Sequence, residues 1–347
     1  MPEFTIMDVT LRDGSYAVNF QFSLAQQRLI TTGLEELGIR YVEIGHGQGL
    51  GASSPENGVA LHTDEEYLET AEKSLKTAKY GTFCIPGIAS VSDVEKASRY
   101  GVSFIRFGTN VTDVRNSEPF IKKALELKIT PMANLMKSYA VTPEEFADCV
   151  ALAESFGAEC VYLVDSAGCM TPDDIRRCYE AVRKVSSVKL GFHGHDNLGL
   201  ALWNSFAAID AGFEMIDCSL QGIGRSSGNT PLELMCINAR KMGYDMDIDI
   251  KKLLNLGKKY VYPLCRKHNS IDIMCGVAGM HTGFLGSVRK VSGEYGVNPL
   301  SLIEKYSEYN RIKMEPEKLE EIAKTLPQDE ESLVIADFNG YFGHGQY

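Results

Sequence analysis

The chain has 347 residues, 44% of them hydrophobic, and a formal net charge of −11. This length allows a large core and fits a barrel of about 250 residues with an extension, while the negative charge disfavours broad binding to nucleic acid or an acidic membrane because phosphates are repelled. The nine cysteines are scattered without a CxxC pair, so we expect free thiols. No basic-then-apolar leader opens the sequence, and no run approaches the ~20 apolar residues of a membrane span. We therefore expect a cytoplasmic protein.

The first two-thirds of the chain repeats one unit, a short β-rich apolar segment followed by a polar turn and a helix-like stretch. Eight segments of this kind predict strands at Phe4–Asp8, Tyr41–Gly45, Gly81–Pro86, Ser103–Gly108, Ile129–Met136, Glu159–Asp165, Val188–Gly194 and Glu214–Leu220. Such alternation implies parallel strands with right-handed crossovers, either closed as a barrel or open as a doubly wound sheet. The even repeat and the lack of a glycine-rich dinucleotide turn after the first strand favour an α/β chain with a (β/α)8 TIM barrel over residues 1–245.

Two helix starts carry clear capping signals, and the helical pattern continues past the last strand. Thr142 and Thr171 each precede a proline and two acidic residues, which predicts helices over Thr142–Phe156 and Pro172–Val185. Later helices without matching strands are expected at Ile250–His268, Thr282–Glu294, Pro299–Tyr306 and Pro316–Thr325. We therefore expect residues 246–347 to form a helical C-terminal extension, which either caps the barrel mouth or makes a subunit contact.

A candidate metal site lies at the predicted strand ends, where barrels of this kind carry their catalytic groups. His193 and His195 end the seventh predicted strand, and residues two apart on a strand point the same way, so both imidazoles can converge on one ion. Asp13, just after the first strand, is the best candidate for a third ligand. Two imidazoles and a carboxylate suit Mn2+, Co2+, Fe2+ or Zn2+ and leave positions open for an oxygen ligand. The alternative is a pair of hydrogen-bonding histidines, because the HxH pattern alone is weak.

Other polar residues follow the same strand ends. Arg12 either forms a structural salt bridge or stabilises an enolate oxygen that the ion also binds. Glu43, at the second strand, either holds Arg12 or reaches a water on the ion. The turn Gly224–Asn229 precedes a predicted helix, so its N–H groups either hold a carboxylate or phosphate or simply form a tight loop.

Three motifs resemble those of a known group of enzymes. DVTLRDGS at Asp8–Ser15, HGHDNLGLA at His193–Ala201 and GIGRSSGNTPLE at Gly222–Glu233 are similar to the metal-dependent aldolase and lyase superfamily, the DRE-TIM metallolyases, and above all to its 4-hydroxy-2-oxovalerate aldolase branch. With further matching segments, the resemblance covers nearly the whole chain. It implies a carbon–carbon lyase that cleaves or forms the bond of a 4-hydroxy-2-oxo acid to give pyruvate and an aldehyde.

The resemblance also implies roles for single residues. Asp13, His193 and His195 are expected to bind a divalent ion, usually Mn2+, with Mg2+, Co2+ or Zn2+ as alternatives. Arg12 is expected to steady the pyruvate enolate, and Ser166 is expected near the 2-oxo acid.

Two further residues and the partners follow from the same resemblance. Asn229 matches a metal ligand of the lyase branch and is assigned here, with Glu43, to substrate binding. Aldolases of this branch often pair with an aldehyde dehydrogenase, so the expected partners are the 2-oxo acid, the aldehyde, such a dehydrogenase and further copies of the chain.

One departure from the branch concerns proton transfer. The aldolases have a His directly after Ser15, where this chain has Tyr16, and a Tyr after the barrel, where this chain has His281. We predict that His281 takes the proton of the substrate hydroxyl, with Tyr16 as its hydrogen-bond partner, because a His near neutrality is the better acceptor. The alternatives are that the two residues reshape the pocket for another aldehyde, or that the proton passes through a water on the ion.

Three other functions stay open. An oxaloacetate decarboxylase would use the same enolate chemistry without a base at C4. An acyl-CoA-using Claisen synthase would share the barrel, although Ser15 stands where those synthases usually carry Glu. A non-catalytic barrel subunit would bind metal weakly and turn over no 2-oxo acid.

Overall fold

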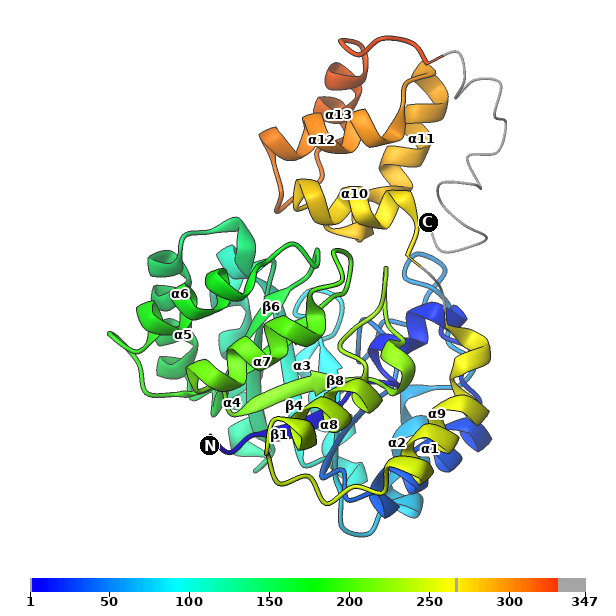
Figure 1. Cartoon of the computed structure of the whole chain (residues 1–347), viewed down its shortest axis with the longest axis vertical. Helices are drawn as coiled ribbons and strands as arrows, with labels where there is room; N and C mark the ends of the chain where they lie inside the picture. The colour runs from blue at the N-terminus through cyan, green and yellow to red at the C-terminus, as the bar shows by residue number, and fades with distance from the viewer. Residues whose placement is uncertain (1, 266–267, 330–347) are drawn as a thin grey trace.

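Eight parallel strands close into a barrel in which neighbours in sequence pair and β8 returns to pair with β1. The structure is a computed structural model that describes residues 2–265 and 268–329 (Figure 1). The strands are β1 (Thr5–Asp8), β2 (Tyr41–Ile44), β3 (Lys79–Cys84), β4 (Phe104–Asn110), β5 (Thr130–Met136), β6 (Cys160–Asp165), β7 (Lys189–Gly194) and β8 (Met215–Cys218). Each predicted strand segment overlaps one of them, and the expected (β/α)8 TIM barrel is confirmed.

Helices on the outside of the barrel follow each strand, and the first seven of them connect successive strands (Figure 1). They are α1 (Leu24–Glu36), α2 (Asp64–Ser74), α3 (Val91–Ala97), α4 (Glu118–Glu126), α5 (Pro143–Phe156), α6 (Pro172–Val182), α7 (Ala201–Ala211) and α8 (Leu232–Lys241). The predicted caps of α5 and α6 are present. The Thr142 hydroxyl accepts from the Glu145 N–H at 3.2 Å, and the Thr171 hydroxyl accepts from the Asp174 N–H at 3.4 Å.

The interior of the barrel holds an apolar cluster and one buried charge network. The apolar cluster consists of Met7, Val9, Phe104, Met132, Cys160, Tyr162, Val164 and Met215. Arg106 of β4 is fully buried, and its Nε donates to Oε1 of Glu43 on β2 at 2.7 Å while its Nη1 donates to Asp217 on β8. Two carboxylates therefore compensate one guanidinium, as a charge removed from water requires.

The C-terminal extension contains five helices in the described part of the chain. They are α9 (Ile250–Tyr260), α10 (Ser270–Ala278), α11 (Leu285–Tyr295), α12 (Pro299–Tyr309) and α13 (Pro316–Ala323). Contacts place α9 against α1 and α8 of the barrel, whereas α10 to α13 share a separate core that begins at Ile271 and form the upper unit in Figure 1. Residues 266–267 of the predicted helix Ile250–His268, and residues 330–347 of the extension, lie outside the described residues.

One helix of the extension was not predicted. The Asn269 side chain accepts from the Asp272 N–H at 2.8 Å and caps α10, which runs through Gly276 and ends at Gly279 in a left-handed conformation. The glycines inside and after this short apolar segment obscured its helical pattern. The turn that follows α10 carries His281, Gly283 and Phe284 to the cavity at the strand ends, so the extension forms part of the wall of that cavity.

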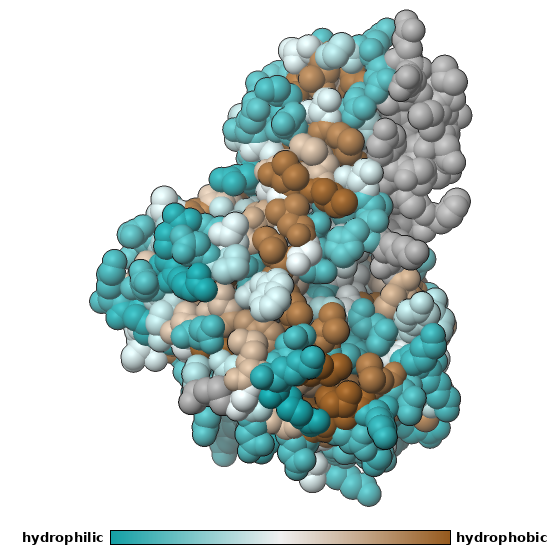
Figure 2. Space-filling view, in the orientation of Figure 1, coloured by the Kyte–Doolittle hydropathy of each residue, from teal (hydrophilic) through white to brown (hydrophobic). Residues whose placement is uncertain are grey.

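Apolar side chains are exposed on two parts of the surface seen in Figure 2, over α10 and, lower in the view, over α8 and α9. The exposed apolar residues there include Ile273, Val277, Leu234 and Leu254. Within the described residues, no single helix has the length and apolar composition to cross a membrane, and only the pair Ser270–Ala278 and Thr282–Tyr295, bent by 116°, meets both measures when taken together.

Candidate active site

A cavity of about 410 Å3 lies at the C-terminal ends of the strands. Its polar and charged lining comes from several strand ends and from the turn after α10. The groups that enter the argument are Arg12, Asp13, Tyr16, Asn110, Asn134, Lys137, Ser166, His193, His195, Arg225 and His281. Seven residues to which the sequence assigned a role therefore share one cavity, in the place where barrels of this kind carry their chemistry.

Asp13, His193 and His195 meet at one point of the cavity wall. All three are buried, and one donor atom from each lies within 4.8 Å of the others. Asp13 begins the short helix η1 (Asp13–Val18) after β1. His193 is the next-to-last residue of β7, and His195 directly follows that strand. The two imidazole ring centroids are 5.1 Å apart. The structure thus brings together the three residues that the sequence proposed as metal ligands.

Hydrogen bonds fix which nitrogen each histidine presents. The Nδ1 of His193 lies 2.7 Å from Oδ2 of Asp217, and the Nδ1 of His195 lies 3.2 Å from the carbonyl oxygen of Gly228. An acceptor opposite Nδ1 places the proton on that nitrogen, so Nε2 of each ring is available to a cation. Asp217 also accepts from Arg106, so the buried charge network of the barrel orients a ligand of the candidate metal site.

The third ligand is held by three donors. Oδ1 of Asp13 accepts from Nη1 of Arg12 at 2.7 Å, and Oδ2 accepts from Nδ2 of Asn229 at 2.8 Å and from the Arg225 N–H at 3.1 Å. Burial raises the pKa of Asp13, but the charge of Arg12 and the hydrogen bond from Asn229 help to hold that pKa below its usual range. The carboxylate is therefore ionised, as a metal ligand must be.

The residues fit a divalent ion. Burial lowers the pKa of His195 to about 4 against the opposing effect of Asp13, so its imidazole is neutral at pH 7 and can donate a lone pair. Two buried polar atoms beside Asp13, Oδ1 of Asn229 and Nη2 of Arg12, have no protein partner. A Cβ at Gly224 would lie 2.8 Å from Oδ2 of Asp13, so only glycine leaves room for the carboxylate at that position. Two imidazoles and a carboxylate are a suitable donor set for first-row divalent ions.

Arg12 is held with one nitrogen unused. Its Nε donates to Oε2 of Glu43 at 2.6 Å, its Nη1 donates to Asp13, and its guanidinium carbon lies 4.7 Å from the centroid of the Phe83 ring. Nη2 is buried and has no hydrogen-bond partner. A buried N–H donor without a partner is costly, so this group is suited to an oxygen of a bound ligand.

Two residues assigned to substrate binding lie behind the cavity wall. Glu43 is fully buried, does not line the cavity, and accepts from both Arg12 and Arg106. Asn229 also does not line this cavity and contacts Asp13 instead. Ser166 does line it, and its hydroxyl accepts from the Lys137 N–H at 3.0 Å.

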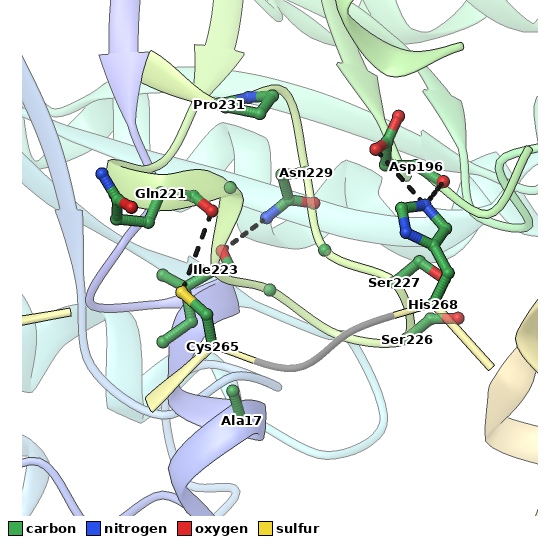
Figure 3. A pocket seen from close by; sticks show the side chains of 13 residues that line it. Ala17, Asp196, Gln221, Ile223, Ser226, Ser227, Asn229, Pro231, Cys265 and His268 are labelled. Atoms are coloured by element: carbon green, nitrogen blue, oxygen red, sulfur yellow. Dashed lines mark hydrogen bonds and ion pairs between the residues drawn. The ribbon is translucent and has the colours of Figure 1, made fainter. Parts of the chain in front are cut away.

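The glycine-rich turn lines a second cavity of about 220 Å3 (Figure 3). Asn229 lies on its wall, and the His268 ring points to Asp196 with 2.6 Å between Nε2 and the Asp196 carbonyl oxygen. The sequence suggested that N–H groups of this turn hold a carboxylate or phosphate. One of them, that of Arg225, is bonded to the carboxylate of Asp13.

Tyr16 and His281 line the same cavity, and Arg225 contacts the surroundings of both. The Arg225 guanidinium carbon lies 4.7 Å from the centroid of the Tyr16 ring, and its Nε lies 3.2 Å from the hydroxyl of Thr282, next to His281. Burial lowers the pKa of His281 well below its usual range, with further lowering by Arg225 and Lys137, and burial raises the pKa of Tyr16. Both side chains are therefore neutral near pH 7.

Several cavity residues had no role in the sequence-based assignment. Arg225 was recognised only as part of a turn, and Lys137, Asn110 and Asn134 were not singled out. Lys137 directly follows the strand predicted at Ile129–Met136, so the rule that site residues follow strand ends would have found it. Nothing local in the sequence indicates that Arg225 points into the cavity.

A family model described as HMGL-like matches residues 3–259. The chain belongs to the HMGL-like family. A 4-hydroxy-2-oxovalerate aldolase from Carboxydothermus hydrogenoformans is 38% identical over 84% of this chain and 88% of its own, and 4-hydroxy-2-oxovalerate aldolase 2 from Comamonas testosteroni is 34% identical over 95% and 96%. The solved HMG-CoA lyase of Brucella melitensis covers 76% of this chain and 99% of its own with a TM-score of 0.65, and at 19% identity it shows the fold alone.

These findings confirm the resemblance expected from the three motifs. The matched range contains the HMGL-like barrel with Asp13, His193 and His195, and the relatives named as aldolases are carbon–carbon lyases. The predicted enzyme class is thereby confirmed.

The orienting role of Asp217 gives a first prediction. In D217N the hydrogen bond to Nδ1 of His193 is weakened, and we expect Mn2+ affinity, measured by titration calorimetry, to fall by about 10- to 100-fold. The matched control is D210N, because Asp210 accepts from the hydroxyl of Tyr244 and does not line the cavity. Wild-type affinity in a folded D217N protein would contradict the assignment.

Proposed function

We propose that this chain is a divalent-metal-dependent aldolase that cleaves or forms the carbon–carbon bond of a 4-hydroxy-2-oxo acid. Cleavage gives pyruvate and an aldehyde, and the reverse reaction joins them. One observation carries the proposal: the donor atoms of Asp13, His193 and His195 converge in a cavity beside Arg12, whose Nη2 has no protein partner. The names of the two relatives, both 4-hydroxy-2-oxovalerate aldolases, support it.

Asp13, His193 and His195 would hold the ion, for which we propose Mn2+ ahead of Mg2+, Co2+ and Zn2+. When bound, such an ion supplies a Lewis acid that polarises the carbonyl of the 2-oxo acid. Arg12 donates from its unpartnered Nη2 to the oxygen on which negative charge develops, because a preformed donor in a water-poor site stabilises that charge strongly. Glu43 and Asp13 hold the guanidinium in place for this task. Ser166 is proposed to lie beside the 2-oxo acid.

Proton transfer at the C4 hydroxyl is proposed for His281, with Tyr16 as its hydrogen-bond partner. Nδ1 of His281 accepts from the Gly283 N–H at 3.1 Å, which favours the neutral form with its proton on Nε2. Uptake of the hydroxyl proton at Nε2 then requires the proton to move to Nδ1 and the contact with Gly283 to open. Catalytic hydrogen bonds of this kind often form only when substrate is bound.

The aldehyde dehydrogenase partner, the homo-oligomer and the cytoplasmic location stay predictions. The exposed apolar residues of α10, α8 and α9 support a contact with a further protein surface (Figure 2).

Pyruvate release tests the function. With Mn2+ present, we expect pyruvate from a panel of 4-hydroxy-2-oxo acids that begins with 4-hydroxy-2-oxovalerate; chelation should remove this activity and added Mn2+ should restore it. If the protein decarboxylates oxaloacetate but cleaves no 4-hydroxy-2-oxo acid, it is a decarboxylase and the aldolase assignment is wrong. If it turns over neither oxaloacetate nor a 4-hydroxy-2-oxo acid, both assignments are rejected.

The proposed base gives a separate prediction. H281A should lose cleavage of the 4-hydroxy-2-oxo acid by at least about 100-fold, the usual contribution of general acid–base catalysis, while its Mn2+ content stays at the wild-type level. Y16F, which removes only the hydroxyl of the partner, should lose less. Any decarboxylation of oxaloacetate needs no base at C4 and should survive in H281A. Full cleavage activity in H281A would refute the assignment of the base.

A further inference from the structure

Two cations in the active-site cavity have no acidic partner. Lys137 and Arg225 both line the cavity, and neither has a carboxylate oxygen within the 4.0 Å of an ion pair among residues 2–265 and 268–329. The acidic residues of the same wall are Asp13, which is already bonded to Arg12, and Glu56, which is exposed. The inner wall therefore carries a surplus of positive charge.

Lys137 is placed where an uncompensated charge is costly. It follows β5, is 7% exposed, and its Nζ donates to the carbonyl oxygen of Ile312 and lies 4.8 Å from the centroid of the Phe284 ring. An ammonium has three N–H donors, so two are left for a ligand. Burial, and then Arg225, lower the pKa of Lys137 to about 8, which is the response expected of a cation without a counter-ion. Asp113 raises the pKa of Lys137, but its Oδ1 lies 3.8 Å from Nζ of Lys313, so this carboxylate already has a partner.

Arg225 faces the same space. Its guanidinium stacks on Tyr16 and donates through Nε to Thr282. The planar guanidinium offers a fork of donors that matches a carboxylate or a phosphate. Arg225 and Lys137 both lower the pKa of His281, so both cations act on the same imidazole.

The cations belong to the aldehyde side of the proposed substrate. In the proposed function the carboxylate of the 2-oxo acid is bound beside Arg12 and the three metal ligands, whereas Tyr16 and His281 meet the C4 hydroxyl. Arg225 contacts Tyr16 and the residue after His281. Lys137 contacts Phe284, whose ring centroid lies 5.9 Å from that of His281. A further cavity of about 440 Å3 shares Tyr16 and Arg225 with the first, so there is space beyond C4 for more than a short alkyl group.

We propose that the aldehyde part of the substrate carries an anionic group, a carboxylate or a phosphate, and that Lys137 and Arg225 bind it. This inference rests on the proposed aldolase function. A neutral aldehyde would leave two cations in the cavity without an anionic partner, whereas an anion makes charge-assisted hydrogen bonds with both. Lys137 and Arg225 are then specificity residues for the acceptor.

The test uses aldol addition of pyruvate to paired aldehydes by the Mn2+-loaded full chain. Succinate semialdehyde is compared with butanal, and glyceraldehyde 3-phosphate is compared with glyceraldehyde, so the two pairs separate carboxylate from phosphate. We expect kcat/KM to favour the anionic member of at least one pair by about 10- to 100-fold, the value of a charge-assisted hydrogen bond. Equal kcat/KM within both pairs would overturn the proposal.

Variants at residue 137 decide whether this preference comes from the cavity. K137M should bring the ratio of kcat/KM for the anionic over the neutral member of a pair close to one, and K137R should restore part of that ratio. K305M is the matched control, because Lys305 is an exposed lysine of α12 that pairs with Glu308 and does not line the cavity. If K137M lowers both members of a pair equally, or raises KM for pyruvate instead, Lys137 has a structural role or binds the donor carboxylate, and the proposal fails.

A binding measurement separates this proposal from the aldolase function. 2-Oxoadipate and 2-oxohexanoate have six carbons each and differ at the distal end, which is a carboxylate in one and a methyl group in the other. Calorimetric titration should show binding of 2-oxoadipate at least about 10-fold tighter, with the difference lost in K137M. This result would support the anion site even if no aldehyde were turned over, and equal affinities would reject it even if the aldolase reaction were observed.

Discussion

The carboxylate of Asp13 is the point on which the rest of the site depends. Oδ1 accepts from Arg12, and Oδ2 accepts from Asn229 and from the backbone of Arg225, so β1, the glycine-rich turn after β8 and the proposed enolate-stabilising group are joined at one residue. A carboxylate buried this deeply stays ionised only because positive charge and N–H donors surround it. The same interactions aim it at His193 and His195.

The buried charges of the barrel form one connected set that orients the site. Glu43 accepts from Arg12 on one side and from Arg106 on the other, and Arg106 continues to Asp217, which holds Nδ1 of His193. Each charge in this chain of contacts has an opposite partner, without which its burial would cost several kcal/mol. A change at Arg106, in the interior of the barrel, would therefore reach both Arg12 and a candidate metal ligand through ordinary ion pairs.

The sequence predicted those parts of the site that depend on short-range pattern. The eight strands follow from apolar segments at regular spacing, and the convergence of His193 and His195 follows from their spacing of two residues on β7. The sequence left two roles open for Glu43, because a glutamate at a strand end is equally suited to hold Arg12 or to face a ligand, and the structure shows it holding Arg12. Lys137 and Arg225 line one cavity only because the barrel closes, and the turn after α10 adds His281 to the same wall. The helix α10 itself was obscured by its glycines.

The central claim is that Asp13, His193 and His195 bind a divalent ion beside an arginine that receives the charge of the enolate. A crystal structure of the protein with Mn2+ and oxalate, an analogue of the pyruvate enolate, with anomalous scattering recorded for manganese, tests it most directly. The account predicts an anomalous peak bonded to the Asp13 carboxylate and to Nε2 of both histidines, with Nη2 of Arg12 donating to the oxalate. Manganese bound elsewhere, or oxalate bound without Arg12, would contradict it.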